Sequence, residues 1–225
     1  MSAPFLLVMA KAPIPGFAKT RLCPPATTRQ AALLAAACLL DTVDAARATG
    51  APVVVALSGS VPDGVLAADV ERALRRVDVI GQRGGGLAER LANAHADAAR
   101  LRPGAPVVQI GMDTPQLTAT QLAHALNVVP VHDAAIGAAT DGGWWALGLH
   151  DPAHAAVLRD VPMSTPDTGA RTRLALRARG LRVAELPVLS DVDTMADALR
   201  VASAAPDTRF ARVLDEVLAV RNTAS

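Results

Sequence analysis

Residues 5–22 read F-L-L-V-M-A-K-A-P-I-P-G-F-A-K-T-R-L, and this stretch sets the expected fold of the chain. The apolar run Phe5–Ala10 predicts a buried strand. Pro13 and Pro15 then exclude a helix, and Gly16 allows a tight turn. A strand that leads through a rigid, cationic loop towards a helix is well suited to phosphate, because backbone N–H groups and cations point at the anion.

Three cations lie in this loop: Lys11, Lys19 and Arg21. Lys11 and Lys19 are the only lysines among the 22 Lys and Arg residues, which favours a role that a guanidinium does not replace. We therefore expect Lys11, Gly16, Lys19 and Arg21 to bind nucleotide phosphates, with the Lys19 side chain in a solvated cleft. The alternative is a solvent-exposed charged loop without a ligand.

Composition narrows the class of protein. The chain has 225 residues, is 51% hydrophobic and carries a formal net charge of +1. These values fit one α/β domain over residues 1–225 and argue against a nucleic-acid partner. No apolar run is long enough to cross a bilayer and no signal peptide is recognisable, so we expect a cytoplasmic protein without a membrane partner. Cys23 and Cys38 are expected to be reduced thiols.

Strand-like and helical patterns alternate along the chain. Strands are predicted at 5–9, 52–57, 77–80, 106–110, 134–139, 144–149 and 181–189. Helices are predicted at 27–50, 65–76, 87–102, 118–129 and 168–179, with two more after the last strand. This alternation predicts a doubly wound, mostly parallel sheet covered on both faces.

Four loops with unusual chemistry follow strands of this predicted sheet. They are the loop at 11–22, the Q-R-G-G-G run at 82–86, the G-M-D-T-P run at 111–115 and the D-V-D-T run at 191–194. In a doubly wound sheet, ligands bind at the carboxyl ends of the strands. We therefore expect the four loops to meet at one edge.

Aspartates in two of these loops are candidate metal ligands. Asp113 follows a buried strand, and a carboxylate there suits Mg²⁺ or Mn²⁺; a turn or helix-capping role is the alternative. Asp191 and Asp193 are candidates for a second carboxylate. Because neighbouring positions of an extended segment point to opposite faces, we expect only one of the two, Asp193, to face the site. Ordinary loop or helix-start acids are an equal alternative.

The run D-G-G-W-W at 141–145 has two interpretations. It predicts a hairpin turn, or it gives Asp141 a hydrogen bond to an acceptor hydroxyl and makes Trp144 a stacking wall. Similarly, the glycines at 84–86 let the backbone approach a nucleoside, or form a flexible loop. No G-x-G-x-x-G follows the first strand, which argues against a dehydrogenase.

Together, these motifs resemble a known set. The order M-A-K-A-P-I-P-G-F-A-K-T-R-L, G-G-L-A-E-R, I-G-M-D-T-P-Q-L, D-G-G-W-W and D-V-D-T is similar to that of the rSAM/selenodomain-associated transferase family. The resemblance covers nearly the whole chain and implies the GT-A fold of nucleotide-diphospho-sugar transferases, a three-layer sandwich. More distantly, residues 19–22 and 113–117 resemble motifs of phospholactate guanylyltransferase and the molybdenum-cofactor guanylyltransferase.

The resemblance also implies site residues. By position it assigns Lys11, Lys19 and Arg21 to the phosphates, Gln82, Gly85 and Gly86 to the nucleoside, and Asp113 and Asp193 to the metal. Ala88, Trp144 and Met163 stand where the family pattern has glycine, tyrosine and an aromatic residue. These departures affect the acceptor pocket more than the nucleotide site.

Three functions follow from this reading. The first, and the one we expect, is metal-dependent glycosyl transfer from a nucleotide sugar to a small-molecule acceptor. The metal, Lys19 and Arg21 would stabilise the departing diphosphate, and Asp141 would be the base. The second is nucleotidyl transfer from a nucleoside triphosphate to a phosphorylated small molecule, which the density of cations and the absence of a D-x-D pair at Asp113 favour. The third is a non-catalytic nucleotide-binding protein. A homodimer is left open.

Overall fold

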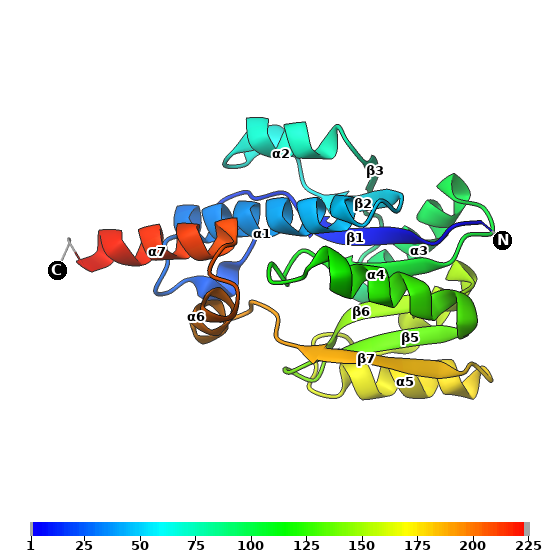
Figure 1. The fold of residues 1–225 in the computed structure, drawn as a ribbon. Helices are drawn as coiled ribbons and strands as arrows, with labels where there is room; N and C mark the ends of the chain where they lie inside the picture. The colour runs from blue at the N-terminus through cyan, green and yellow to red at the C-terminus, as the bar shows by residue number, and fades with distance from the viewer. Residues whose placement is uncertain (1, 223–225) are drawn as a thin grey trace.

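The computed structural model describes residues 2–222 and has a central sheet with helices on both faces (Figure 1). The seven strands have the order β3-β2-β1-β4-β6-β5-β7. Only β6 runs antiparallel to its neighbours in this sheet of the described chain. The predicted three-layer, mostly parallel architecture is therefore confirmed. The strands are β1 (Phe5–Lys11), β2 (Val53–Ser58), β3 (Asp78–Gly81), β4 (Val107–Gly111), β5 (Ala134–Ala139), β6 (Trp144–Leu149) and β7 (Val183–Leu189).

The helices form the two outer layers. They are α1 (Thr28–Ala48), α2 (Ala67–Leu74), α3 (Leu87–Leu101), α4 (Ala119–Val128), α5 (Thr168–Ala178), α6 (Met195–Ala204) and α7 (Arg209–Asn222), with 3₁₀ segments η1 (Thr20–Leu22), η2 (Val61–Asp63), η3 (Val129–Val131) and η4 (Pro152–Asp160). Helices α1, α2, α4, α6 and α7 share one buried cluster. Helices α3 and α5 share the other with η4. None of the helices within residues 2–222 is both long and apolar enough to span a membrane.

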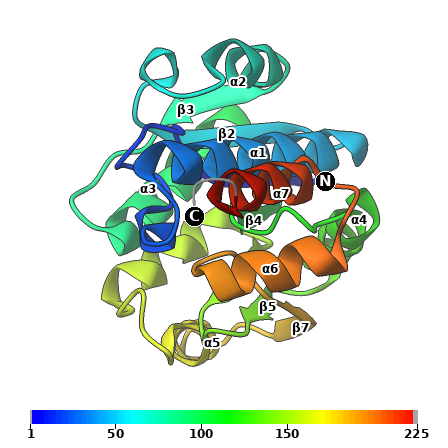
Figure 2. The ribbon, with the colours of Figure 1, turned by 90° about the vertical axis from the view of Figure 1, so that its left-hand side faces the viewer.

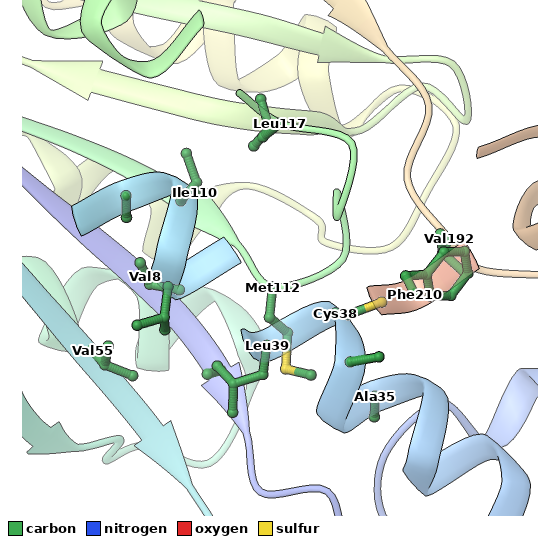
Figure 3. Packing of buried hydrophobic residues seen from close by; sticks show 14 of the residues in the cluster. Val8, Ala35, Cys38, Leu39, Val55, Ile110, Met112, Leu117, Val192 and Phe210 are labelled. Atoms are coloured by element: carbon green, nitrogen blue, oxygen red, sulfur yellow. The ribbon is translucent and has the colours of Figure 1, made fainter. Parts of the chain in front are cut away.

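The buried cluster that contains α1 also holds the segment after β7, which carries the D-V-D-T run of the site. Val8, Val55 and Ile110 rise from the sheet under α1, and Cys38 of α1 lies beside Val192 and Phe210 (Figure 3). Val192 is fully buried although it belongs to the irregular segment after β7. Burial of this one side chain therefore anchors the D-V-D-T run to the core.

Local sequence explains where the helices begin and end. Thr27, Thr118 and Thr194 each form a capping box at the start of a helix. Gly180, with φ +79°, follows α5 in the left-handed conformation that ends many helices. These caps and this stop are local signals, because each acts within a few residues of the helix end.

The longest 3₁₀ segment, η4, has no counterpart among the predicted elements. It packs against α3. Asp151 starts it by accepting a hydrogen bond from Ala153 N at 2.9 Å. Its apolar residues recur too irregularly for a helical pattern, so tertiary packing decides its structure.

The edge at which β1 ends lies on the left in Figure 1 and faces the viewer in Figure 2. The loop after β1 crosses this edge, and α6 lies there too. The candidate functional site is built on this side of the sheet.

Candidate functional site

A cleft of about 580 Å³ opens at the carboxyl ends of β1 and β4. It is lined by the loop after β1, the first turn of α3, the turn between β5 and β6, and the segments 163–168 and 191–193. Gln82, Gly111 and Asp113 line it as well. The predicted meeting of the four loops at one edge is therefore confirmed.

Lys19 ties the loop after β1 to two distant segments. Its Nζ pairs with Asp113 and donates to the carbonyl oxygen of Val192. Burial alone would lower the pKa of Lys19, but the charge of Asp113 and its hydrogen bond hold that pKa above the ordinary value. The buried ammonium is therefore a fixed positive charge.

The expectation that Lys19 lies in a solvated cleft is wrong. Its side chain is only 6% exposed, because the loop folds back over the segment after β7. Lys19 itself has φ 54° at the start of η1, so the backbone turns sharply there. Its ammonium still lines the cleft, but it also holds the fold together.

The other loop residues differ in their surroundings. Arg21 Nη1 lies 2.5 Å from Asp193 Oδ2, with the Arg21 side chain 65% exposed. Lys11 Nζ lies 5.6 Å from the centroid of the Phe17 ring. Gly16, with φ +79°, makes the turn and is not among the cleft-lining residues. The structure brings the three cations together, and their contact with phosphate stays a prediction.

Three carboxylates gather across the cleft. Asp141, Asp191 and Asp193 each offer an oxygen, and these oxygens lie within 4.8 Å of one another. The expectation that only one of the last two faces the site is wrong. Residues two apart in an extended segment share a face, and Val192 between them takes the buried one.

The acidic group fits a divalent cation. Burial first, and then the charges of Asp141, Asp193 and Asp113, raise the pKa of Asp191 to about 6. A bound cation relieves such crowding, and oxygen donors of this kind suit Mg²⁺ or Mn²⁺. Of the two predicted ligands, Asp193 belongs to the group of three, whereas Asp113 pairs with Lys19. Both assignments stay predictions.

The Asp141–Gly143 turn is locked in place by close backbone packing. Asp141 Oδ1 accepts from Gly143 N at 2.8 Å, as the hairpin interpretation predicts. Gly142 has φ +90°, and a Cβ there would lie 1.8 Å from the carbonyl oxygen of Pro166. Gly169 N donates to Gly142 O at 2.8 Å. Only glycine permits this approach, which joins the hairpin to the wall at 163–168.

The adjacent tryptophans point to opposite faces of the sheet. Trp145 is buried and its indole donates to the carbonyl oxygen of Pro187 at 2.8 Å. Trp144 lines the cleft and packs with the cluster on the α3 face. The structure thus places Trp144 where a stacking wall was expected, and its contact with a ligand stays a prediction.

The predicted nucleoside residues are placed unequally. Gln82 lines the cleft, and its Nε2 donates to the carbonyl oxygens of Ala10 and Ala56 at 2.9 and 2.8 Å. It therefore holds the ends of β1 and β2 together. Gly85 N donates to Glu89 Oε2 at 2.9 Å, and neither it nor Gly86 is among the residues lining the cleft.

Arg90, Gln109 and Ser164 are among the cleft-lining residues that the sequence patterns do not single out. Arg90 belongs to the G-G-L-A-E-R motif, but helical periodicity does not distinguish it from a surface arginine. Gln109 interrupts the apolar strand V-V-Q-I-G, and a polar residue inside a buried strand is the signal that identifies it. Ser164 has φ 59°, a strain that no sequence pattern indicates.

The sheet order and the cleft at its carboxyl edge define a transferase with the nucleotide-diphospho-sugar transferase fold. A crystal structure from Desulfovibrio desulfuricans G20, provisionally described as such a transferase, shares this fold with a TM-score of 0.83 and 27% identity, covering 99% of this chain and 98% of that one. The chain belongs to the bacterial family described as "Uncharacterized protein conserved in bacteria (DUF2064)", which matches residues 40–165.

Two further proteins are similar. The 3-phospho-D-glycerate guanylyltransferase of Phenylobacterium zucineum (strain HLK1) is 33% identical over 212 residues, which are 89% of this chain and 91% of that protein. Rv0371c of Mycobacterium tuberculosis H37Rv, crystallised with manganese, is 22% identical with a TM-score of 0.54, covering 90% and 99% of the two chains. The expected transferase class is confirmed, and the narrower rSAM-associated family stays a prediction.

Proposed function

We propose that this chain is a nucleotidyltransferase that moves a guanylyl group from GTP to the phosphate of a small phosphorylated organic acid. The observation that carries the proposal is one cleft in which loop cations, Lys11, Lys19 and Arg21, face clustered carboxylates. The named reaction of the Phenylobacterium relative supports the guanylyl donor and a 3-phosphoglycerate-like acceptor.

In the proposed step, a phosphate oxygen of the acceptor attacks the α-phosphorus of GTP. A new P–O bond forms, the bond between the α-phosphorus and the oxygen bridging to the β-phosphorus breaks, and its electron pair leaves on pyrophosphate. The cations of the loop after β1 would bind the β- and γ-phosphates and stabilise the charge that develops on pyrophosphate. The buried Lys19 ammonium would supply part of the stabilising positive charge, and it would do so without reorganisation because it is already fixed in place.

Nucleotidyl transfer also changes the role of Asp141. A phosphate monoester with a pKa near 6 is already largely deprotonated at neutral pH, so it needs no base. Asp141 is then free to join Asp191 and Asp193, with Asp113 beside them, in holding Mg²⁺ or Mn²⁺. Such an ion would neutralise phosphate charge when bound. The manganese complex of Rv0371c is in keeping with this assignment.

The test is to incubate the protein with Mg²⁺, GTP and 3-phospho-D-glycerate, follow pyrophosphate release, and identify the product by mass spectrometry. We expect pyrophosphate and a guanylylated acid in equal amounts, both dependent on the acceptor and both abolished by EDTA. Arg21→Gln should lower kcat/KM at least tenfold. Arg29→Gln, which removes an exposed arginine outside the cleft, should leave it unchanged.

Glycosyl transfer is the second candidate, because the Desulfovibrio structure matches nearly the whole chain. A panel of nucleotide sugars separates the two: release of nucleoside diphosphate without pyrophosphate would overturn the nucleotidyl proposal. If the protein binds GTP but forms no product in the GTP assay or with the nucleotide sugars, the non-catalytic alternative is favoured. A cytoplasmic location and a homodimer stay predictions.

A further inference from the structure

We call the part of the cleft lined by Arg90, Leu91, Gln109, Trp144 and Met163 its α3 side. This side carries hydrogen-bond donors that lack partners. Arg90 Nε and Trp144 Nε1 are both buried without an acceptor among the described residues, and both residues line the cleft. Within the part of the chain that the structure describes, Arg90 also makes no ion pair, whereas Lys19 and Arg21 each have a carboxylate. These two nitrogens are themselves closed to the cleft. The Arg90 guanidinium has no acceptor among the described residues, so its positive charge is available to an anionic ligand in the cleft.

Gln109 adds a third donor, and His95 orients it. Gln109 lies in β4, 2% exposed, with its Oε1 3.0 Å from His95 Nε2. Burial lowers the pKa of His95 to about 4, although the hydrogen bond to Gln109 opposes this. His95 is therefore neutral at pH 7, and its Nε2–H donates to Gln109. The Gln109 amide is left with its N–H₂ group as the donor available to the cleft.

These groups lie on the same side of the sheet. Trp144, Leu91 and Met163 belong to the apolar cluster on the α3 face, and Gln109 is held beneath α3 by His95. The carboxylates that line the cleft follow β4, β5 and β7 instead. Apolar walls beside an arginine without a carboxylate partner favour an anionic oxygen.

The reaction geometry determines which anion this is. In the proposed transfer, the acceptor phosphate must reach the α-phosphorus of a nucleotide held by the loop after β1. The opposite end of a short acceptor then points into the α3 side. In a phosphorylated organic acid that end is the carboxylate.

We propose that the Arg90 guanidinium, assisted by the Gln109 amide, binds the acceptor carboxylate beside the apolar wall of Trp144 and makes the enzyme select phosphorylated acids over phosphorylated alcohols. This inference rests on the proposed function. A site built to bond a polar group rejects the analogue without it strongly, because its buried donors then stay unpaired.

The test compares 3-phospho-D-glycerate with glycerol 3-phosphate, which keeps the phosphate and replaces the carboxylate by CH₂OH. At saturating GTP and Mg²⁺, we expect the native protein to favour the acid at least 100-fold in kcat/KM. Arg90→Gln should reduce this preference at least tenfold, through KM for the acid, with KM for GTP unchanged. Arg100→Gln is the matched control, because Arg100 lies on the same helix, 71% exposed and outside the cleft.

The outcomes separate this inference from the proposed function. Guanylyl transfer with unchanged selectivity in Arg90→Gln would overturn the role of Arg90 alone, as would a raised KM for GTP. If no transfer occurs, the shift in melting temperature caused by 3-phospho-D-glycerate alone tests the carboxylate subsite. A shift that is lost in Arg90→Gln and kept in Arg100→Gln would support the subsite, although the proposed function would have failed. No shift in the native protein overturns both.

Discussion

The two sides of the cleft satisfy their polar groups in opposite ways. On the side formed by the loop after β1, which we call the loop side, Lys19 is paired with Asp113 and Arg21 with Asp193. Lys19 also donates to the carbonyl oxygen of Val192. On the α3 side, the buried Nε of Arg90 has no partner in the described chain. The loop side is therefore held together by its own charges, whereas the Arg90 charge on the α3 side is not compensated by a carboxylate of the described chain. Removing the paired charge of Lys19 should therefore cost stability, and removing the unpaired charge of Arg90 should cost binding.

The largest effect is expected where the α3 side is attached to the hairpin. Gly142→Ala would place a Cβ 1.8 Å from Pro166 O at φ +90°, so backbone must move. We expect a loss of about 4 kcal/mol in unfolding free energy, from the strained conformation and the forced displacement together. Urea denaturation measures it.

Gly180→Ala is the matched control for this prediction. Gly180 has φ +79° but nothing within 4 Å of its added Cβ, so only the left-handed backbone penalty of about 1 kcal/mol applies. Equal losses in the two variants would mean that the contact with Pro166 does not lock the hairpin.

A pH dependence of stability is expected from His95, which supports Gln109. Its pKa in the folded protein, about 4, lies below the ordinary value of 6.5, so between these values the unfolded chain binds more protons. The contribution is complete above pH 6.5 and is lost as the pH falls towards 4, by about 3 kcal/mol. Denaturation curves from pH 7 to pH 4 measure it.

Carboxylates also titrate in this range, so the comparison needs His95→Gln, which cannot protonate. The stability difference between the native protein and this variant should shrink steadily as the pH falls from 6.5 to 4. A constant difference over that range would show that His95 does not resist protonation in the fold.

The smallest of the three effects concerns the loop side. Lys19→Met keeps the aliphatic stem but removes the charge that Asp113 and Val192 O bind. We expect a loss of about 2 kcal/mol, below the value for a fully buried pair because the Asp113 side chain is 46% exposed. Thermal denaturation without ligand measures it, and the Lys19→Met/Asp113→Asn double variant gives the coupling.

Lys11→Met is the control, because Lys11 is exposed and has no ion pair among residues 2–222. It should leave the unfolding free energy within about 0.5 kcal/mol of the native value. Equal stability of the two methionine variants would mean that the pairing of Lys19 with Asp113 and Val192 does not stabilise the loop side.

Local chemistry made much of the fold predictable. The unbroken apolar run of β1 predicts a strand covered on both faces, and Thr27 and Thr118 are side-chain caps that act within three residues. The four loops that meet at one edge follow from the alternation of strands and helices. In contrast, η4 has a local signal only at its start, where Asp151 caps it, and its extent depends on packing against α3.

The site was predictable in its parts but not in its pairings. The scarcity of lysine pointed to Lys19, but its burial depends on Val192, which lies 173 positions away. Asp191 and Asp193 lie two positions apart, so both face the cleft while Val192 between them is buried. Arg90 belongs to the G-G-L-A-E-R motif, and only its lack of a partner in the fold distinguishes it from a surface arginine.

By itself, the sequence determined the order of strands and helices, the rigid cationic loop after β1 and the acids that follow the later strands, because these depend on neighbours along the chain. Only the tertiary structure decided which charges compensate each other. Ion pairs and unpaired donors arise from segments that folding brings together, and a donor such as Arg90 becomes informative only when its surroundings offer it no acceptor.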